Sequence, residues 1–129
     1  MNSIEKLTTG FKSFRDGDFE DQKVTYKTLV DGGQSPKVAL IACSDSRVDP
    51  SIILKTDPGD LFVVRNVANL VPPYEREGHY HGTSAALEFA VQHLEVEHLI
   101  ILGHAYCGGI QSLFGKPSRG AEGHQFVPP

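Results

Sequence analysis

Three short apolar runs alternate along the chain with segments of helical periodicity. The runs are Lys37–Ala42, Leu61–Arg65 and His98–Leu102. Their length, together with the flanking Pro36 and Gly103, favours strands over helices, and we expect the first two strands to be buried. Strands that alternate with helices predict an α/β fold, in which a parallel β-sheet is flanked by helices.

The predicted helices are Ile4–Phe14, Phe19–Val30, Ser51–Lys55, Thr83–Leu94 and Gly108–Phe114. In Ile4–Phe14 and Thr83–Leu94, apolar residues three or four positions apart lie on one helical face. Asp49 followed by Pro50 is typical of a helix start, with the carboxylate at the N-cap and proline at the first helical position. The segment Asn66–His81 is rich in Asn, Pro and Gly, so we expect a long functional loop there.

The chain of 129 residues has the length of a single domain. Within it we predict an N-terminal helical arm over residues 1–33, a core over residues 34–114 that carries the candidate metal site, and a loop-like tail over residues 115–129. Three strands make a small sheet. We therefore expect that the C-terminal part of the fold is missing, with the natural chain continuing past Pro129, or that a partner chain covers the exposed sheet edge.

The charge balance argues against two classes of partner. The net charge is −4 and the pI is near 5.8, so the chain offers no basic stripe for nucleic acid. No apolar run approaches the roughly 20 residues that span a membrane, and residues 1–14 lack the apolar stretch of a secretory signal. We expect a cytoplasmic, reducing location, where two cysteines serve as thiols or metal ligands.

Three residues of metal-ligating types follow two of the predicted strands. Cys43 comes directly after the first strand, and His104 and Cys107 follow the third. Because the carboxyl ends of parallel strands line one edge of a sheet, we expect these residues to converge. Two thiolates and an imidazole suit Zn²⁺, and three protein ligands leave one tetrahedral position open, as in catalytic sites.

A simpler interpretation is that the two cysteines and the histidine are packing residues. A lone His-x-x-Cys pattern is weak evidence for a metal, but its placement at a strand end, together with Cys43, favours a metal site. A phosphatase loop is excluded, because it would need arginine six residues after the cysteine, where Asp49 stands.

Asp45 and Arg47 lie two and four residues beyond Cys43. They can form a loop ion pair, or Asp45 can accept a hydrogen bond from the zinc-bound nucleophile while Arg47 keeps it ionised. Asp45 can also turn inward as the fourth zinc ligand, which would close the site. The sequence leaves these states open.

Both motifs occur together in one known family. Cys43-Ser-Asp-Ser-Arg47 and the later Gly-His-Ala-Tyr-Cys-Gly-Gly, residues 103–109, closely resemble the paired signature of beta-class carbonic anhydrases. Residues 60–69 between them also look like the family, and the resemblance runs from about Gln34 to Leu113. It implies that Cys43, His104 and Cys107 bind Zn²⁺ and that Asp45 and Arg47 form the catalytic dyad. It also implies a lyase, in which zinc-bound hydroxide converts carbon dioxide reversibly to bicarbonate and a proton.

The resemblance also implies a substrate pocket shared between two subunits. Gln34 matches the glutamine that contacts bicarbonate, and Phe62 and Phe89 match positions that wall the carbon dioxide pocket across a dimer interface. Val67 and Gly108 complete the predicted substrate-binding set. A homodimer or a higher even oligomer is therefore expected.

Two departures from the family pattern bear on function. Some members have a tryptophan where this chain has Leu40, as part of an inhibitory bicarbonate site, so its absence favours an open zinc site. Family members also continue well past the second motif. Two alternative hypotheses follow, an inactive zinc- or bicarbonate-binding homologue and a structural fragment that assembles with a complete chain.

Overall fold

The computed structural model describes residues 1–115, so the predicted tail lies almost wholly outside the described residues. The chain divides into two compact units, Met1–Gln34 and Ser35–Pro129, and each is described by itself. Within residues 1–115, no helix is both long enough and apolar enough to cross a bilayer.

The first unit is helical, with α1 at Ser3–Asp16, α2 at Asp18–Asp21 and α3 at Lys23–Gly32. Asn2 and Glu5 cap the start of α1 reciprocally, each side chain accepting from the other's backbone N–H. The rings of Phe14, Phe19 and Tyr26 lie 5.2–6.2 Å apart between centroids and hold the helices together. The apolar side chains of the first two turns of α1 remain exposed.

The expectation of one helix over Phe19–Val30 is wrong, because the helix is interrupted at Gln22, between α2 and α3. Three acidic residues, Asp18, Glu20 and Asp21, crowd the single turn of α2. Acidic side chains stabilise the start of a helix and destabilise its end. A break after Asp21 is consistent with that preference.

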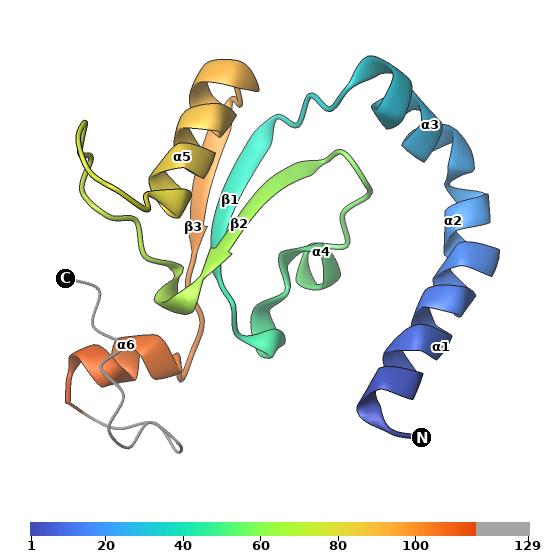
Figure 1. The fold of residues 1–129 in the computed structure, drawn as a ribbon, viewed down its shortest axis with the longest axis horizontal. Coiled ribbons are helices and arrows are strands. Elements are labelled where there is room, and N and C mark those ends of the chain that lie inside the picture. Colours follow the sequence, from blue (N-terminus) through green and yellow to red (C-terminus); the bar gives the residue numbers. More distant parts are fainter. Residues whose placement is uncertain (116–129) are drawn as a thin grey trace. The chain divides into compact units, whose positions relative to one another are not determined.

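The second unit contains a three-stranded parallel sheet, as predicted (Figure 1). Its strands are β1 at Val38–Cys43, β2 at Leu61–Asn66 and β3 at His98–Leu102, in the order β2-β1-β3. In the register, Cys43 pairs with Asn66, and Ala42 pairs with Leu102. The carboxyl ends of all three strands therefore lie at one edge.

The connections carry the remaining helices. A short 3-10 turn at Ser46–Val48 and α4 at Pro50–Ile53 follow β1, and the Asp49 carboxylate accepts the Ser51 N–H at the start of α4, as predicted. The predicted helix Thr83–Leu94 is α5 at Gly82–Glu88, extended by a wider π turn at Phe89–His93. The last helix, α6, spans Gly108–Leu113.

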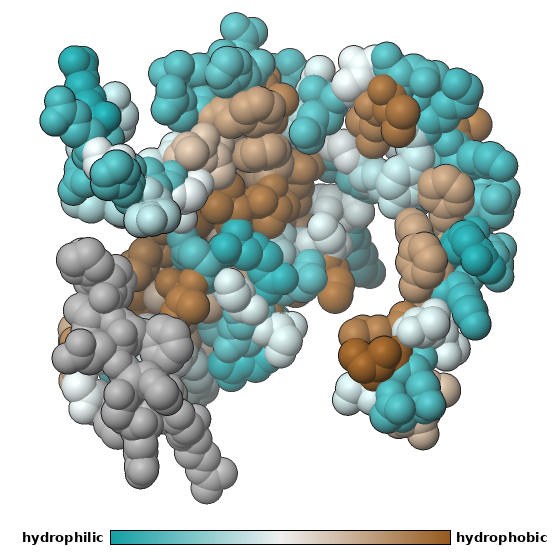
Figure 2. Space-filling view, viewed as in Figure 1, coloured by the Kyte–Doolittle hydropathy of each residue, from teal (hydrophilic) through white to brown (hydrophobic). Residues whose placement is uncertain are grey.

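Of the three described strands, only the central strand β1 is mostly buried. Residues 39–42 of β1 are at most 1% exposed and form the core of the sheet. The expectation that β2 is also a buried strand is wrong, since Val63 is 36% exposed and the rest of β2 is only partly covered. β2 and β3 are edge strands, and an edge lacks a neighbour on one side. On the face shown in Figure 2, apolar side chains gather over α5 and the sheet.

Candidate metal centre

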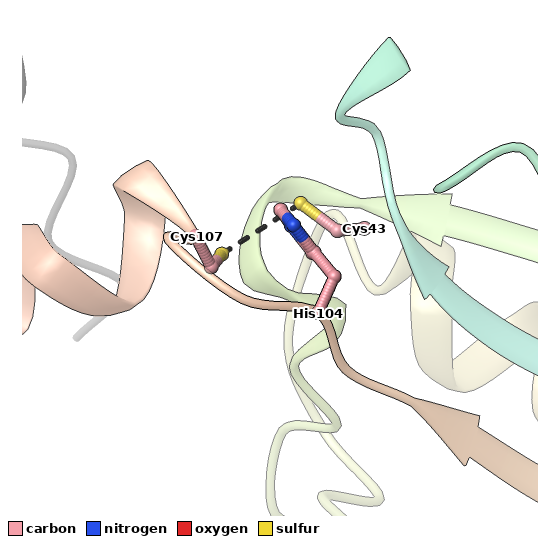
Figure 3. Close-up of side chains that lie close together, drawn as sticks. All are labelled: Cys43, His104 and Cys107. Atoms are coloured by element: carbon pink, nitrogen blue, oxygen red, sulfur yellow. Dashed lines mark hydrogen bonds between the residues drawn. The ribbon is translucent and has the colours of Figure 1, made fainter. Parts of the chain in front are cut away.

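The edge formed by the carboxyl ends of the strands holds the three predicted ligands. Cys43 is the last residue of β1, and His104 and Cys107 lie in the loop between β3 and α6. Their side chains point toward one another (Figure 3). One ligand atom from each residue lies within 4.8 Å of the other two. The fold thus brings together residues that are far apart in the sequence.

The spacing of the sulfur atoms fits a tetrahedral zinc ion. Two Zn–S bonds of about 2.3 Å at a tetrahedral angle would place the sulfurs about 3.8 Å apart. The Sγ atoms of Cys43 and Cys107 lie 3.8 Å apart. Both cysteines are buried and are free thiols rather than a disulfide.

His104 presents the nitrogen that such a site needs. Its Nδ1 lies 3.0 Å from the carbonyl oxygen of Ala105. A carbonyl only accepts, so Nδ1 carries the proton and Nε2 keeps its lone pair. Nε2 is buried and has no hydrogen-bond partner among residues 1–115. A buried imidazole nitrogen with a free lone pair, beside two thiols, provides the three ligand atoms of a zinc site. The Ala105 carbonyl fixes the orientation of the imidazole ring.

The surroundings of Cys43 favour its thiolate. Burial alone would raise the pKa of this thiol, but hydrogen bonds to the sulfur, foremost from the backbone of Asp45, outweigh the effect of burial and lower the pKa to about 7. The backbone N–H of Ala68 also donates to Cys43 Sγ at 3.4 Å. A thiolate is the form of cysteine that binds metal.

Asp45 is held by Arg47 on the loop after β1. Arg47 Nε and Nη2 donate to the two carboxylate oxygens at 3.0 and 2.8 Å, and the Arg47 backbone N–H donates at 2.8 Å. The side-chain hydrogen bonds lower the pKa of Asp45 well below its usual range and raise that of Arg47. Arg47 Nη2 also donates to the carbonyl oxygen of Tyr106 at 3.1 Å, which links this loop to the Cys107 loop.

This arrangement fits two of the three possibilities that the sequence leaves open, the loop ion pair and the hydrogen-bond acceptor held by Arg47. The Asp45 carboxylate is paired with Arg47, and the cluster of potential ligands consists of Cys43, His104 and Cys107 without it. The predicted role of Asp45 as a fourth ligand belongs to a closed state that differs from this arrangement.

The predicted pocket residues do not all lie together in the structure. The rings of Phe62 and Phe89 lie 5.7 Å apart. Phe62 pairs with Ala39, four residues before the Cys43–Asn66 pair, which is about 13 Å along the strand. Val67, in contrast, follows β2 directly and lies next to the start of α6.

The remaining two predicted substrate contacts differ in position. Gly108 is the first residue of α6 and directly follows Cys107. Gln34 is the last residue of the first unit, Met1–Gln34. Its contact with bicarbonate stays a prediction.

Two residues that contact this site were not predicted. Ala68 donates to Cys43 from a backbone with φ 70°, and Arg65 reaches the loop after β1 from the end of β2. The available signal for Arg65 was a charged residue at the end of an otherwise apolar strand. No signal marked Ala68, because its role belongs to its backbone.

Comparison with known proteins gives the family. A family profile described as "Carbonic anhydrase" matches residues 38–127. The chain belongs to the carbonic anhydrase family. It is 50% identical over 117 residues to "Beta carbonic anhydrase 5, chloroplastic" of Arabidopsis thaliana, which covers 91% of this chain and 38% of that protein.

Solved structures agree with the beta class. The beta-carbonic anhydrase CcaA superposes with a TM-score of 0.81 and 38% identity, over 88% of this chain and 54% of that one. A structure from a study of two tetrameric beta-carbonic anhydrases of Sordaria macrospora gives a TM-score of 0.77 and 33% identity, over 93% and 58%. The chain thus spans little more than half of these structures.

Proposed function

We propose that this protein is a zinc-dependent lyase that catalyses the reversible hydration of carbon dioxide to bicarbonate and a proton. The observation that carries the proposal is the Cys43–His104–Cys107 cluster, whose 3.8 Å sulfur separation suits Zn²⁺, beside the Asp45–Arg47 pair. The beta carbonic anhydrases among its relatives support the same reaction.

In this proposal each residue at the site has a defined task. Cys43, His104 and Cys107 hold the zinc ion. Zinc, when bound, acts as a Lewis acid that makes a water-derived nucleophile available near neutral pH. Asp45 accepts a hydrogen bond from the attacking water and orients it. Arg47 donates twice to Oδ1 of Asp45 and once to Oδ2, so Oδ2 keeps a lone pair that is free to accept.

Arg47 has an electrostatic task. Its guanidinium keeps Asp45 ionised, so the carboxylate acts as an acceptor rather than a donor. It also keeps the carboxylate turned away from the ligand cluster. We therefore propose the open arrangement, with three protein ligands and a free coordination position, as the active one.

We further propose that the active unit is a homodimer or a higher even oligomer. Within one chain, Phe62 and Phe89 lie far along the sheet from the ligand cluster, so a pocket that combines them with the metal needs a second chain. In such an assembly Gln34, Val67 and Gly108 would complete the substrate contacts. The description of the Sordaria macrospora relatives as tetrameric supports an even oligomer.

We propose a reducing compartment such as the cytoplasm for this protein. Two buried free thiols 3.8 Å apart bind metal only while they stay reduced. Immunolocalisation of the native protein tests the location, and detection in an oxidising compartment would contradict it.

The direct test is a stopped-flow carbon dioxide hydration assay on protein whose zinc content has been measured. We expect one zinc per chain and hydration well above the buffer rate, abolished by a chelator and restored by zinc. Stoichiometric zinc without hydration would support the inactive homologue, and neither zinc nor hydration would support the structural fragment.

A further inference from the structure

The side chain of Arg65 joins three points of the loop that follows β1. Its Nε donates to the carbonyl oxygen of Cys43 at 3.0 Å, and its Nη2 donates to the carbonyl oxygen of Asp45 at 2.7 Å. Its Nη1 lies 3.4 Å from Oδ2 of Asp49. One guanidinium thus joins the last residue of β1, Asp45 in the loop, and the residue that caps the start of α4.

Two of these acceptors are the backbone carbonyls of Cys43, a proposed zinc ligand, and Asp45, the proposed acceptor for the attacking water. A hydrogen bond that holds a carbonyl oxygen fixes the peptide plane on one side of that residue's α-carbon. It therefore restricts the direction of that residue's side chain. By holding the carbonyls of Cys43 and Asp45 together, Arg65 restricts where the thiol and the carboxylate point relative to each other. The other end of the loop is also fixed, because Asp49 caps α4 through Ser51.

Arginine is the residue that suits this task. Its planar guanidinium presents several N–H donors in fixed directions, whereas a lysine ammonium is a point charge on a flexible stem. The Arg65 side chain is 28% exposed, against 58% for Arg47, so its bonds are better shielded from water. Arg47 fixes the carboxylate group of Asp45, and Arg65 fixes the backbone of the same residue.

We propose that Arg65 is a positioning residue that fixes the orientation of the Cys43 thiolate and the Asp45 carboxylate relative to each other at the metal centre. Its hydrogen bonds go to the carbonyl oxygens of Cys43 and Asp45 and to the Asp49 carboxylate, rather than to the proposed metal ligand atoms or the carboxylate oxygens of Asp45. The proposal rests on the metal centre proposed above, but its main test is independent of carbon dioxide hydration.

The test compares Arg65→Gln and Arg65→Lys with the matched control Lys37→Gln. Lys37 also carries a positive charge next to β1, but it pairs with Glu97 at the opposite end of the sheet and is 67% exposed. Zinc dissociation constants come from competition with a chromophoric chelator. Cobalt(II) substitution gives a visible spectrum that reports the thiolate geometry in the folded protein.

We expect Arg65→Gln to weaken zinc binding on the order of 10- to 100-fold and to change the cobalt spectrum. Arg65→Lys should recover part of the affinity, and Lys37→Gln should match the wild type in both measurements. In the hydration assay, Arg65→Lys should lower kcat more than it raises KM. Should Arg65→Gln fail to fold, Arg65→Lys, which keeps the charge, provides the comparison.

A wild-type cobalt spectrum and zinc affinity in the folded Arg65 variants would overturn the proposal. So would a loss of thermal stability alone, with the spectrum unchanged, since that pattern describes a residue that only supports the fold. A wild-type protein that binds no zinc would instead refute the metal centre itself.

Discussion

Cys107 is one of the three ligands that the structure brings together within residues 1–115, so its loss leaves two members of this cluster. We expect Cys107→Ser to lose bound zinc and hydration activity together, because serine is a far weaker zinc ligand than a thiolate. Elemental analysis of the purified variant beside the wild type checks this. Full zinc occupancy in the variant would show that the ligand set is wrong.

Asp45 differs from the ligands because its proposed role is to orient the attacking water with a carboxylate that Arg47 keeps charged. Asp45→Asn should retain zinc but lose turnover on the order of 100-fold or more. The amide donates where an acceptor is needed and carries no charge for Arg47. Stopped-flow rates per bound zinc provide the measurement.

The control for Asp45→Asn is Asp31→Asn, which removes an exposed carboxylate that pairs with Lys27 in α3. The control should keep the wild-type rate. A near-normal rate for Asp45→Asn would reduce Asp45 to a residue that only shapes its loop.

The start of α6 approaches the turn after β2 too closely for a side chain. A Cβ on Gly109 would lie 2.8 Å from Ala68 Cβ and from Val67 Cγ1. We expect Gly109→Ala to destabilise the protein by about 1–3 kcal/mol, since inserted atoms force well-packed neighbours apart. It should also weaken zinc binding, because Cys107 precedes this helix.

Gly10→Ala is the matched control for the glycine variant. Gly10 lies inside α1, and a Cβ there would have no neighbour within 4 Å. Alanine is the better helix former, so this variant should be neutral or more stable by up to about 1 kcal/mol. Urea unfolding of both variants gives the comparison, and equal stability changes would contradict the packing argument.

The elements of the core were largely predictable, because short apolar runs and helical spacing are local signals. The break at Gln22 and the π turn at Phe89–His93 were not, since each departs from the uniform helix that the apolar spacing implies. The exposure of β2 depends on strand order, which its own residues do not reveal.

Only part of the site was predictable from the sequence. Convergence of Cys43 with His104 and Cys107 follows from the rule that parallel strands end at one edge. The contacts of Arg65 follow from its register opposite Ala42, which no local pattern specifies. The orientation of Asp45 was not predictable from the sequence either, because the open and the closed state use the same residues.

An apolar stripe on α1 is a further reason to expect assembly. Leu7 and Phe11 are 68% and 61% exposed, and large exposed apolar groups mark interaction surfaces. We expect Leu7→Glu to shift the sedimenting species toward the monomer and to lower activity, because a carboxylate in an apolar interface is costly.

Lys6→Glu is the control for this variant, because it changes a charged residue next to Leu7 in the same helix. It should leave the oligomer intact. Analytical ultracentrifugation of the zinc-loaded protein at micromolar concentration checks both. A fully active wild-type species at 14.1 kDa would contradict the oligomer and the shared pocket.

The ligands of the metal centre come from the ends of two different strands, β1 and β3. An unfolded chain does not hold them together, so zinc would bind the folded state almost exclusively. By mass action, each tenfold rise in free zinc above the dissociation constant would then add about 1.4 kcal/mol to the free energy of unfolding. Melting temperatures measured in zinc buffers would show this dependence. In a cell, zinc supply would therefore govern how much of this protein survives proteolysis as well as how much of it is active.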